Sequence, residues 1–112
     1  MSYQREREEF LSAFAREFPN ASAEVARLML RNASAEQRYN EITSSIEVSE
    51  REAARLDKAS TLRGRRMRKL CFDIGATLVE HGDPRGNPYL ITTPSKRELS
   101  IPGRGLPASA FR

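Results

Sequence analysis

The hydrophobic pattern of the chain changes its period at Gly75, and this change divides the sequence into two parts. Before Gly75, apolar residues recur every three or four positions, which places them on one face of a helix. After it, the short segments 76–81, 88–93 and 97–101 are rich in strand-forming residues and are separated by turn residues. The sequence therefore predicts the α+β class, with a three-helix N-terminal bundle followed by a small antiparallel β-hairpin or meander.

The first part of the sequence contains the signals of three helices. They are expected over about residues 3–18, 22–45 and 49–73, within a single domain of residues 1–112 that ends in a loop-rich tail, 102–112. The first helix has phenylalanine at every fourth position, which defines its buried face. Ser2 is suited to cap this helix, Ser49 and Glu52 form a capping box for the third, and Gly75 is a typical stop.

The segment 22–45 allows two interpretations. An apolar seam with 3-4 spacing runs along it, formed by Val25, Leu28, Asn32, Ala35, Tyr39, Ile42 and Ile46. The motif NASAE occurs at both 20–24 and 32–36, so Ser34 and Gln37 could cap a second, separate helix. We favour one continuous helix because the seam crosses the second copy unbroken. Its length also predicts that two copies of the chain pair through this seam as a homodimer.

Residues that most catalytic and metal sites require are scarce. Cys71 and His81 are the only cysteine and histidine, so neither a zinc cluster nor an internal disulfide is expected. Cys71 is expected to be a small core thiol, and Asp83 to bond the backbone of its own turn. No P-loop motif is present, and PGRG at 102–105 is too short to hold phosphates. We therefore expect a protein that is not an enzyme, with no catalytic residue, no cofactor and no metal.

The sequence has no sign of membrane targeting. Its N-terminal residues are charged where a signal peptide would be apolar, and no apolar run reaches the length of a membrane span. The lone cysteine also suits a reducing compartment. A cytoplasmic protein with no membrane partner is the expectation.

Positive charge is concentrated in the second half of the chain. Residues 1–60 hold nine Lys or Arg against eleven Asp or Glu, whereas residues 61–112 hold ten against four. The densest stretch is TLRGRRMRKL, residues 61–70, with five cations in ten positions. This asymmetry predicts a polyanionic or acidic partner; the simpler alternative is a basic face that only serves solubility.

The five cations of this stretch point in different directions on a helix, which turns about 100° per residue. The expected buried stripe consists of Leu56, Ala59 or Ser60, Met67, Leu70 and Ile74. Arg65, Arg68 and Lys69 point away from this stripe, and Arg66 lies at its border. Arg63 falls on the stripe itself, so it has to pair with an acid, extend its head group to solvent or mark a break in the helix.

The candidate binding site combines the outward cations of the third helix with those of the C-terminal segment. Its residues are Arg65, Arg66, Arg68, Lys69, Arg85, Lys96, Arg97 and Arg104. Three or four phosphate contacts would give weak, salt-dependent and non-specific binding. Aromatic residues are not interleaved with the basic ones along the sequence, so stacking on single-stranded bases is not expected.

Two segments resemble small proteins carried by tailed bacteriophages. FAREFPNASAEVARLMLR, residues 14–31, is similar to their aromatic-Pro helix pair, and GDPRGNPYLITTPS, residues 82–95, to an element whose strand ends in PSG. This chain has Lys96 in place of that glycine. It also lacks the cysteines that such proteins often carry in the middle segment, so no metal site is carried over. The resemblance covers about a third of the chain and implies a phage or prophage accessory gene acting in the host cytoplasm.

The charge pattern and the resemblance together predict a non-enzymatic phage-type accessory protein. It would bind nucleic acid or a nucleoprotein through a basic surface of its C-terminal half. The alternative is a protein–protein inhibitor of a host factor or defence complex, comparable to anti-CRISPR proteins, that applies the same residues to an acidic surface. Both hypotheses require the cations of the third helix and of the loop 82–86 to share one side of the molecule.

Overall fold

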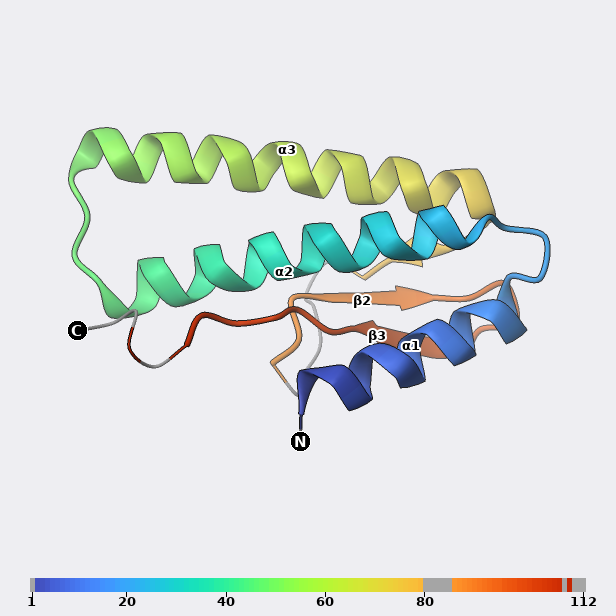
Figure 1. Ribbon diagram of the computed structural model, residues 1–112. Coiled ribbons are helices and arrows are strands. Elements are labelled where there is room, and N and C mark those ends of the chain that lie inside the picture. Colours follow the sequence, from blue (N-terminus) through green and yellow to red (C-terminus); the bar gives the residue numbers. More distant parts are fainter. Residues whose placement is uncertain (1, 80–85, 108, 110–112) are drawn as a thin grey trace.

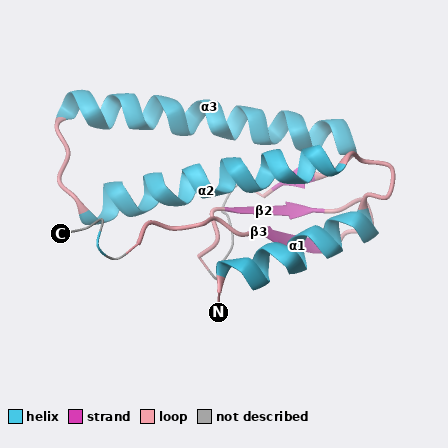
Figure 2. Ribbon diagram, in the orientation of Figure 1, coloured by secondary structure: helices cyan, strands magenta, loops and turns pink. Residues whose placement is uncertain are grey.

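The computed structural model describes residues 2–79, 86–107 and 109 and confirms the predicted α+β architecture (Figures 1 and 2). Three helices come first in the chain and a three-stranded antiparallel sheet follows. The elements are α1 (Tyr3–Glu17), α2 (Ala23–Ser45), α3 (Glu50–Ile74), β1 (Thr77–Leu78), β2 (Tyr89–Thr92) and β3 (Glu98–Ile101). Each helix begins and ends within one residue of its predicted bounds. The strands are shorter than predicted, and residues 80 and 81 of the first expected strand lie outside the described residues.

Side-chain caps account for the positions of the helix ends. The Oγ atoms of Ser2, Ser22 and Ser49 accept hydrogen bonds from backbone N–H groups of the first turn of α1, α2 and α3. Gly75 ends α3 in the left-handed conformation, with φ 80°, and its N–H donates to the carbonyls of Cys71 and Phe72. The predicted capping box is half formed, because the carboxylate of Glu52 pairs with Arg55 instead of returning to the cap.

The helix α2 is continuous, as we predicted in preference to two separate helices. Ser34 does not cap a second helix, because its Oγ accepts a hydrogen bond of 3.0 Å from the backbone N–H of Arg104 in the C-terminal segment. Gly64 does not break α3 either. A helix interior tolerates one glycine at a cost of about 1 kcal/mol when its neighbours hold the helix by tertiary packing.

α2 is the central helix of the fold and packs against α3, α1 and β3. In Figure 1, α2 and α3 run antiparallel and side by side, while α1, β2 and β3 lie below α2 in this view. The strand order is β1-β2-β3, with β1 packed against α3 and β3 against α1. The helix pair and the sheet therefore enclose one apolar core from opposite sides.

The core is built from every element around α2. Its largest fully buried side chains include Phe10 of α1, Met29 of α2, Met67 of α3 and Ile91 of β2. The three phenylalanines of the first helical segment are all buried, with successive ring centroids 5.8 and 4.9 Å apart. Such tilted ring pairs add stability beyond the apolar area they bury.

The seam predicted for α2 meets the neighbouring helix α3 at Asn32 and Tyr39, but it is not the most buried face of α2. The fully buried residues are Ala26, Met29, Leu30 and Ala33, which the seam omits. Seam residues Asn32 and Tyr39 instead meet α3, whereas Ile46 is 40% exposed. The reason is that α2 contacts two layers, and its deepest positions point between them. Of these buried residues, Ala26 and Ala33 are small and allow neighbouring backbones to approach closely.

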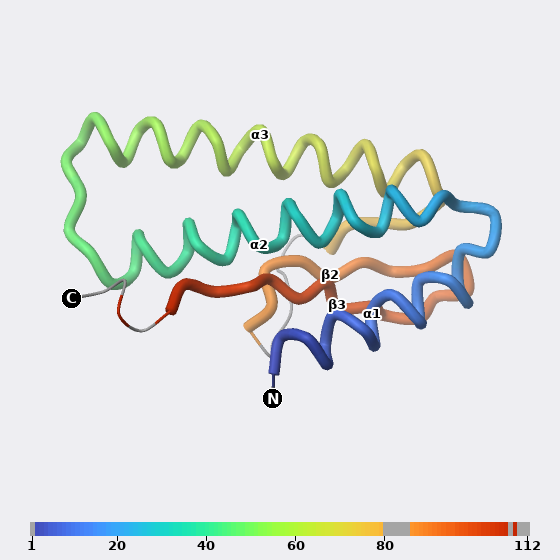
Figure 3. Tube along the Cα trace, in the orientation of Figure 1, coloured from blue at the N-terminus to red at the C-terminus, as the bar shows by residue number. Residues whose placement is uncertain are grey.

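The segment that follows β3 runs back along α2, as the tube in Figure 3 shows. The backbone N–H of Leu106 donates to the Glu41 carboxylate at 2.7 Å. A Cβ atom at Gly103 would collide with the backbone carbonyl of Ala33, and one at Gly105 with the Glu41 carboxylate. The two glycines of PGRG thus serve close packing against α2.

The β2–β3 hairpin turns through Thr93, Pro94, Ser95, Lys96 and Arg97. The N–H of Lys96 donates to the Thr93 carbonyl at 2.9 Å, and the N–H of Thr93 donates to the Arg97 carbonyl at 2.8 Å. Residues 93–96 thus form a β-turn with Pro94 at its second position, and Lys96, the last of the three loop residues 94–96, has φ 67°. This three-residue loop normally places glycine where Lys96 stands.

Two glycine sites give a contrasting stability prediction. Gly64→Ala should raise the free energy of unfolding by about 0.5–1 kcal/mol, since the nearest atom to the new Cβ lies 3.7 Å away and helix propensity improves. Gly103→Ala should lower it by about 1–3 kcal/mol because the backbone of α2 cannot yield. Urea unfolding of both variants measures this. If the two substitutions changed the free energy of unfolding equally, the close packing of the C-terminal segment against α2 would be contradicted.

A second prediction concerns Lys96. Replacing it with glycine should raise the free energy of unfolding by about 0.5–1 kcal/mol, because glycine removes the left-handed strain and loses part of that gain to unfolded-state entropy. Lys96→Ala is the control, since it removes the charge and keeps the strain. The midpoint of thermal unfolding should rise for the glycine variant and stay unchanged for the alanine variant.

Candidate binding surface on helix α3

The cations of TLRGRRMRKL lie on one uninterrupted helix whose orientation is fixed by Met67, which is fully buried. At about 100° per residue, Arg65 and Lys69 lie about 160° from Met67, on the outer face of α3. Arg66 and Arg68 lie about 100° to either side of Met67. All four of these side chains are exposed, as the sequence predicted.

Arg63 points inward and is neutralised there by an acid of α2. Its guanidinium lies 3.0 Å from a carboxylate oxygen of Glu36, and both side chains are only about 15% exposed. Ser60 donates to the same carboxylate at 2.8 and 2.9 Å, and Arg63 also lies 5.9 Å from the centre of the Tyr39 ring. The Tyr39 hydroxyl in turn donates to Asp57 at 2.5 Å, which raises its pKa. Of the three predicted fates of Arg63, the structure shows the ion pair.

The outward cations have little acidic compensation. Within residues 2–79 and 86–107, no acidic side chain lies within ion-pair distance of Arg65, Arg66 or Arg68. Lys69 lies 3.8 Å from Asp73 one turn later, with both side chains exposed. Exposed pairs of this kind are worth about 0–1 kcal/mol, so Lys69 can exchange Asp73 for another anion.

Two flanks of α3 carry hollows beside these cations. On the sheet side, a hollow of about 520 Å³ has Arg68 and Tyr89 in its wall. Burial raises the pKa of Tyr89 to about 12, so this hydroxyl keeps its proton at neutral pH. On the other flank, a groove of about 400 Å³ between α2 and α3 has Arg31, Arg66, Asn32, Lys69 and Asp73 around the apolar residues Leu28 and Leu70. Arg31 of α2 was not among the predicted binding residues.

Lys96 and Arg97 do not join the outer face of α3. They belong to the β2–β3 turn, which Glu17 fastens to α1: Ser95 donates to the Glu17 carboxylate at 2.6 Å, and Arg97 lies 3.8 Å from it. The hydrogen bonds from Ser95 and Thr93 hold the pKa of Glu17 below its usual value, with Arg97 a smaller cause.

Arg104 also lies apart from α3, on the segment after β3 that runs along α2. Arg85 and the turn 82–85 are outside the described residues. Thus the expectation that the helix and the C-terminal segment form one basic side is wrong for Lys96, Arg97 and Arg104. These cations are carried by segments that are fastened to α1 and α2.

Phe72 is the residue that the sequence interpretation missed. It is 84% exposed, far more than the next large apolar side chains, Ile46 at 40% and Leu62 at 39%. It stands three residues after Lys69 and four after Arg68, so all three share one region of the helix surface. The sequence alone gives an angle of about 140° between Phe72 and Met67 around the helix axis, and this angle indicates that Phe72 faces away from the core. Aromatic residues are not interleaved with the cations along the sequence, but on the helix surface Phe72 lies beside them.

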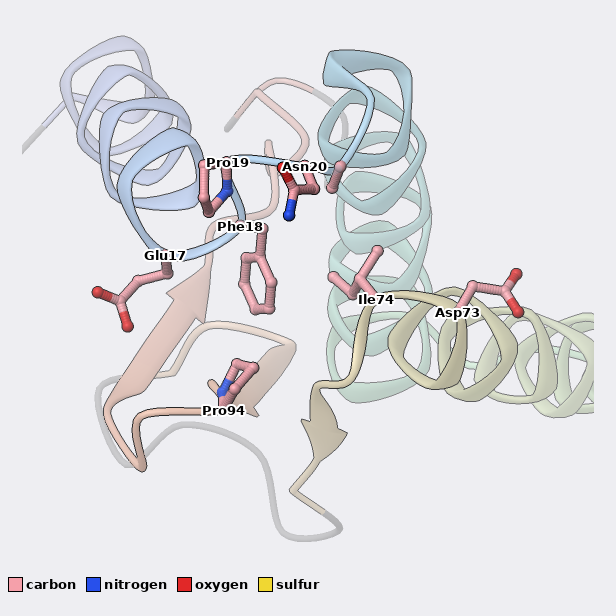
Figure 4. A pocket seen from close by; sticks show the side chains of 8 residues that line it. Glu17, Phe18, Pro19, Asn20, Asp73, Ile74 and Pro94 are labelled. Atoms are coloured by element: carbon pink, nitrogen blue, oxygen red, sulfur yellow. The ribbon is translucent and has the colours of Figure 1, made fainter.

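The pocket at the end of α3 does not form a paired-acid site. Its volume is about 310 Å³, and Phe18, Ile74 and Pro94 line it between α1, α3 and the β2–β3 turn. Glu17 and Asp73 also border it, but Figure 4 shows their carboxylates pointing away from the pocket and from each other. General acid–base work by two carboxylates requires them to converge on one reacting group.

Cys71 is buried in the core, as predicted, and burial raises the pKa of its thiol to about 11. The thiol therefore stays protonated at neutral pH and is a poor nucleophile. Across the described part of the chain, no group of three His, Cys, Asp or Glu side chains could hold a metal ion. His81 and Asp83 are outside it. None of the helices, over the same residues, is long and apolar enough to cross a membrane.

No protein-family model matches the sequence, and comparisons with curated proteins and with solved structures give no match. The resemblance to phage proteins therefore remains an expectation. Function has to be inferred from the geometry and charge of the chain itself.

The inward ion pair yields a testable prediction. Arg63→Met should lower the free energy of unfolding by about 2–4 kcal/mol, because it leaves the Glu36 carboxylate largely buried without its countercharge. The control Arg65→Met, two residues later on the outer face, should change it by less than about 0.5 kcal/mol. The double variant Glu36→Met/Arg63→Met should recover most of the loss. Urea unfolding measures all three, and equal stability of the two single variants would contradict the assigned orientation of α3.

Proposed function

We propose that this protein is a non-enzymatic accessory protein that binds nucleic acid through the outer face of α3. Arg65, Arg68 and Lys69 contact phosphates, and Arg66 joins them from the flank. The observation that supports this proposal most strongly is the sorting of cations on one continuous helix. The inward Arg63 is neutralised by the largely buried Glu36, whereas the outward cations have, among the described residues, only the exposed pair of Lys69 with Asp73. The resemblance to phage accessory proteins suits a small host-cytoplasmic binder of this kind.

The number of outward cations sets the strength of binding. Three or four phosphate contacts on duplex DNA correspond to a salt slope of about −3 and to non-specific affinity in the micromolar range or weaker. All four cations are assigned to phosphates in this proposal, so none of them reads a base edge as an arginine can at guanine. The proposed activity is therefore backbone binding with little sequence preference.

A host protein, including a nucleic-acid-binding defence complex, is the alternative partner. The groove between α2 and α3 favours it, because its apolar residues Leu28 and Leu70 surrounded by Arg31, Arg66 and Lys69 would suit an acidic protein surface with an apolar anchor. A homodimer through the α2 seam stays a prediction. Seam residues Asn32 and Tyr39 contact α3 of the same chain, so a dimer would have to use the remaining positions.

A mobility-shift titration with random duplex DNA at low and moderate salt tests the proposal. Arg65→Ala/Arg68→Ala should weaken binding and reduce the salt slope by about 2, since each lost phosphate contact removes about 1. Arg97→Ala/Arg104→Ala removes the same charge from other elements and should leave the slope nearly unchanged. If both double variants lose binding equally, net charge and not the α3 face is responsible. If the unmodified protein gives no shift at about 100 μM, the weak end of non-specific affinity, the alternative gains support and capture of a host partner becomes the next experiment.

A further inference from the structure

Phe72 is the most exposed large apolar side chain among the described residues, and its neighbours give that exposure a meaning. A single apolar residue on a surface needs no explanation by itself. Here, however, the ring lies within one helical turn of Lys69 and Arg68, with Arg65 one turn further. It stands at the C-terminal end of the outer cationic face.

The ring of Phe72 is also uncovered. The cation–π contact found in the described part of the chain joins Arg63 to Tyr39, and the close ring pairs there are those of Phe10, Phe14 and Phe18. An exposure of 84% leaves the faces of the Phe72 ring open to solvent although cations stand beside it. Both faces are therefore free to receive a flat partner.

We infer that the nucleic acid bound by α3 is single-stranded and that Phe72 stacks against one of its bases. This inference rests on the proposed function and names its substrate class. An aromatic ring beside phosphate-binding cations is the combination that single-strand binding proteins use, because every base has a π-face. In a duplex the base faces are already stacked on each other, so the ring would gain nothing unless it forced a step apart.

The charge count supports a single strand for a second reason. Three or four cations alone hold a duplex only weakly, and duplex binding makes no use of Phe72. On a single strand, one base stacked on an aromatic ring strengthens binding by about 5- to 100-fold. The same few cations then suffice, with a salt slope of about −2 to −3.

Fluorescence anisotropy with labelled nucleic acids tests the inference. The probes are an oligodeoxythymidine of about 20 nucleotides, longer than a typical site, and a duplex of the same length. Phe72→Ala should weaken binding of the single strand by about 5-fold or more and leave duplex binding unchanged. Phe72→Tyr should retain binding, because the tyrosine ring can stack. The control Leu62→Ala, on the same helix, should behave as the unmodified protein.

Tryptophan at the same position provides a direct readout of stacking. The chain contains no tryptophan, so Phe72→Trp places a single indole at the proposed contact. Adding the oligodeoxythymidine should quench its fluorescence, and the quenching should saturate with the anisotropy curve. The control Ile46→Trp, at an exposed position after the last turn of α2, should show little quenching. Thermal unfolding of each variant verifies the fold, which an 84% exposed position is not expected to disturb.

The outcomes separate this inference from the proposed function. If Phe72→Ala binds the single strand within twofold of the unmodified protein, or if it weakens duplex and single strand equally, the stacking inference is wrong. Duplex binding that depends on Arg65 and Arg68 would then still support the proposed function. If neither nucleic acid binds, both fail, and the surface has to be assigned to an acidic protein.

Discussion

The ion pair between Glu36 and Arg63 is the contact on which the rest of this structure depends. It joins the middle of α2 to the middle of α3, where the sequence of α3 is too basic for a purely apolar seam. A largely buried guanidinium without a countercharge would have to break the helix or turn it. Because Glu36 supplies that charge, α3 stays straight through Gly64 and Met67 stays buried. The direction of every other cation on α3 follows.

The position of α2 between two layers explains the packing around it. One side of α2 meets α3 through polar and half-buried residues, and the other meets α1, the sheet and the C-terminal segment. Its buried positions hold Met29 and Leu30, which fill the core, and Ala26 and Ala33, which allow the neighbouring backbones to come close. Gly103 has the same role from the opposing segment. Close approach by small residues replaces the long apolar seam that the sequence suggested.

The positive charges of this molecule lie on separate structural elements. The cations that share α3 remain together on its outer side, because one rigid helix fixes their relative directions. Arg97 is instead held beside Glu17 at the end of α1, and Arg104 lies along α2. The uncovered ring of Phe72 then sets the α3 face apart from the other basic positions. A polyanion with exposed flat groups matches this combination better than a uniform anionic surface would.

The sequence by itself determined the order of the elements, the helix ends, the buried phenylalanines and the directions of the cations within α3. These depend on local capping and on the fixed angle between residues of one helix, which are readable from a single chain. Only the tertiary structure decided that Glu36 is the partner of Arg63 and that Lys96, Arg97 and Arg104 lie away from α3. It also decided which face of α2 is buried, the one with Ala26, Met29, Leu30 and Ala33. Those facts depend on how separate elements pack, and residue spacing within one element carries no information about that. Phe72 belongs to both cases. Its angle around the helix axis follows from the sequence, but its exposure shows that none of the described elements covers that side of α3.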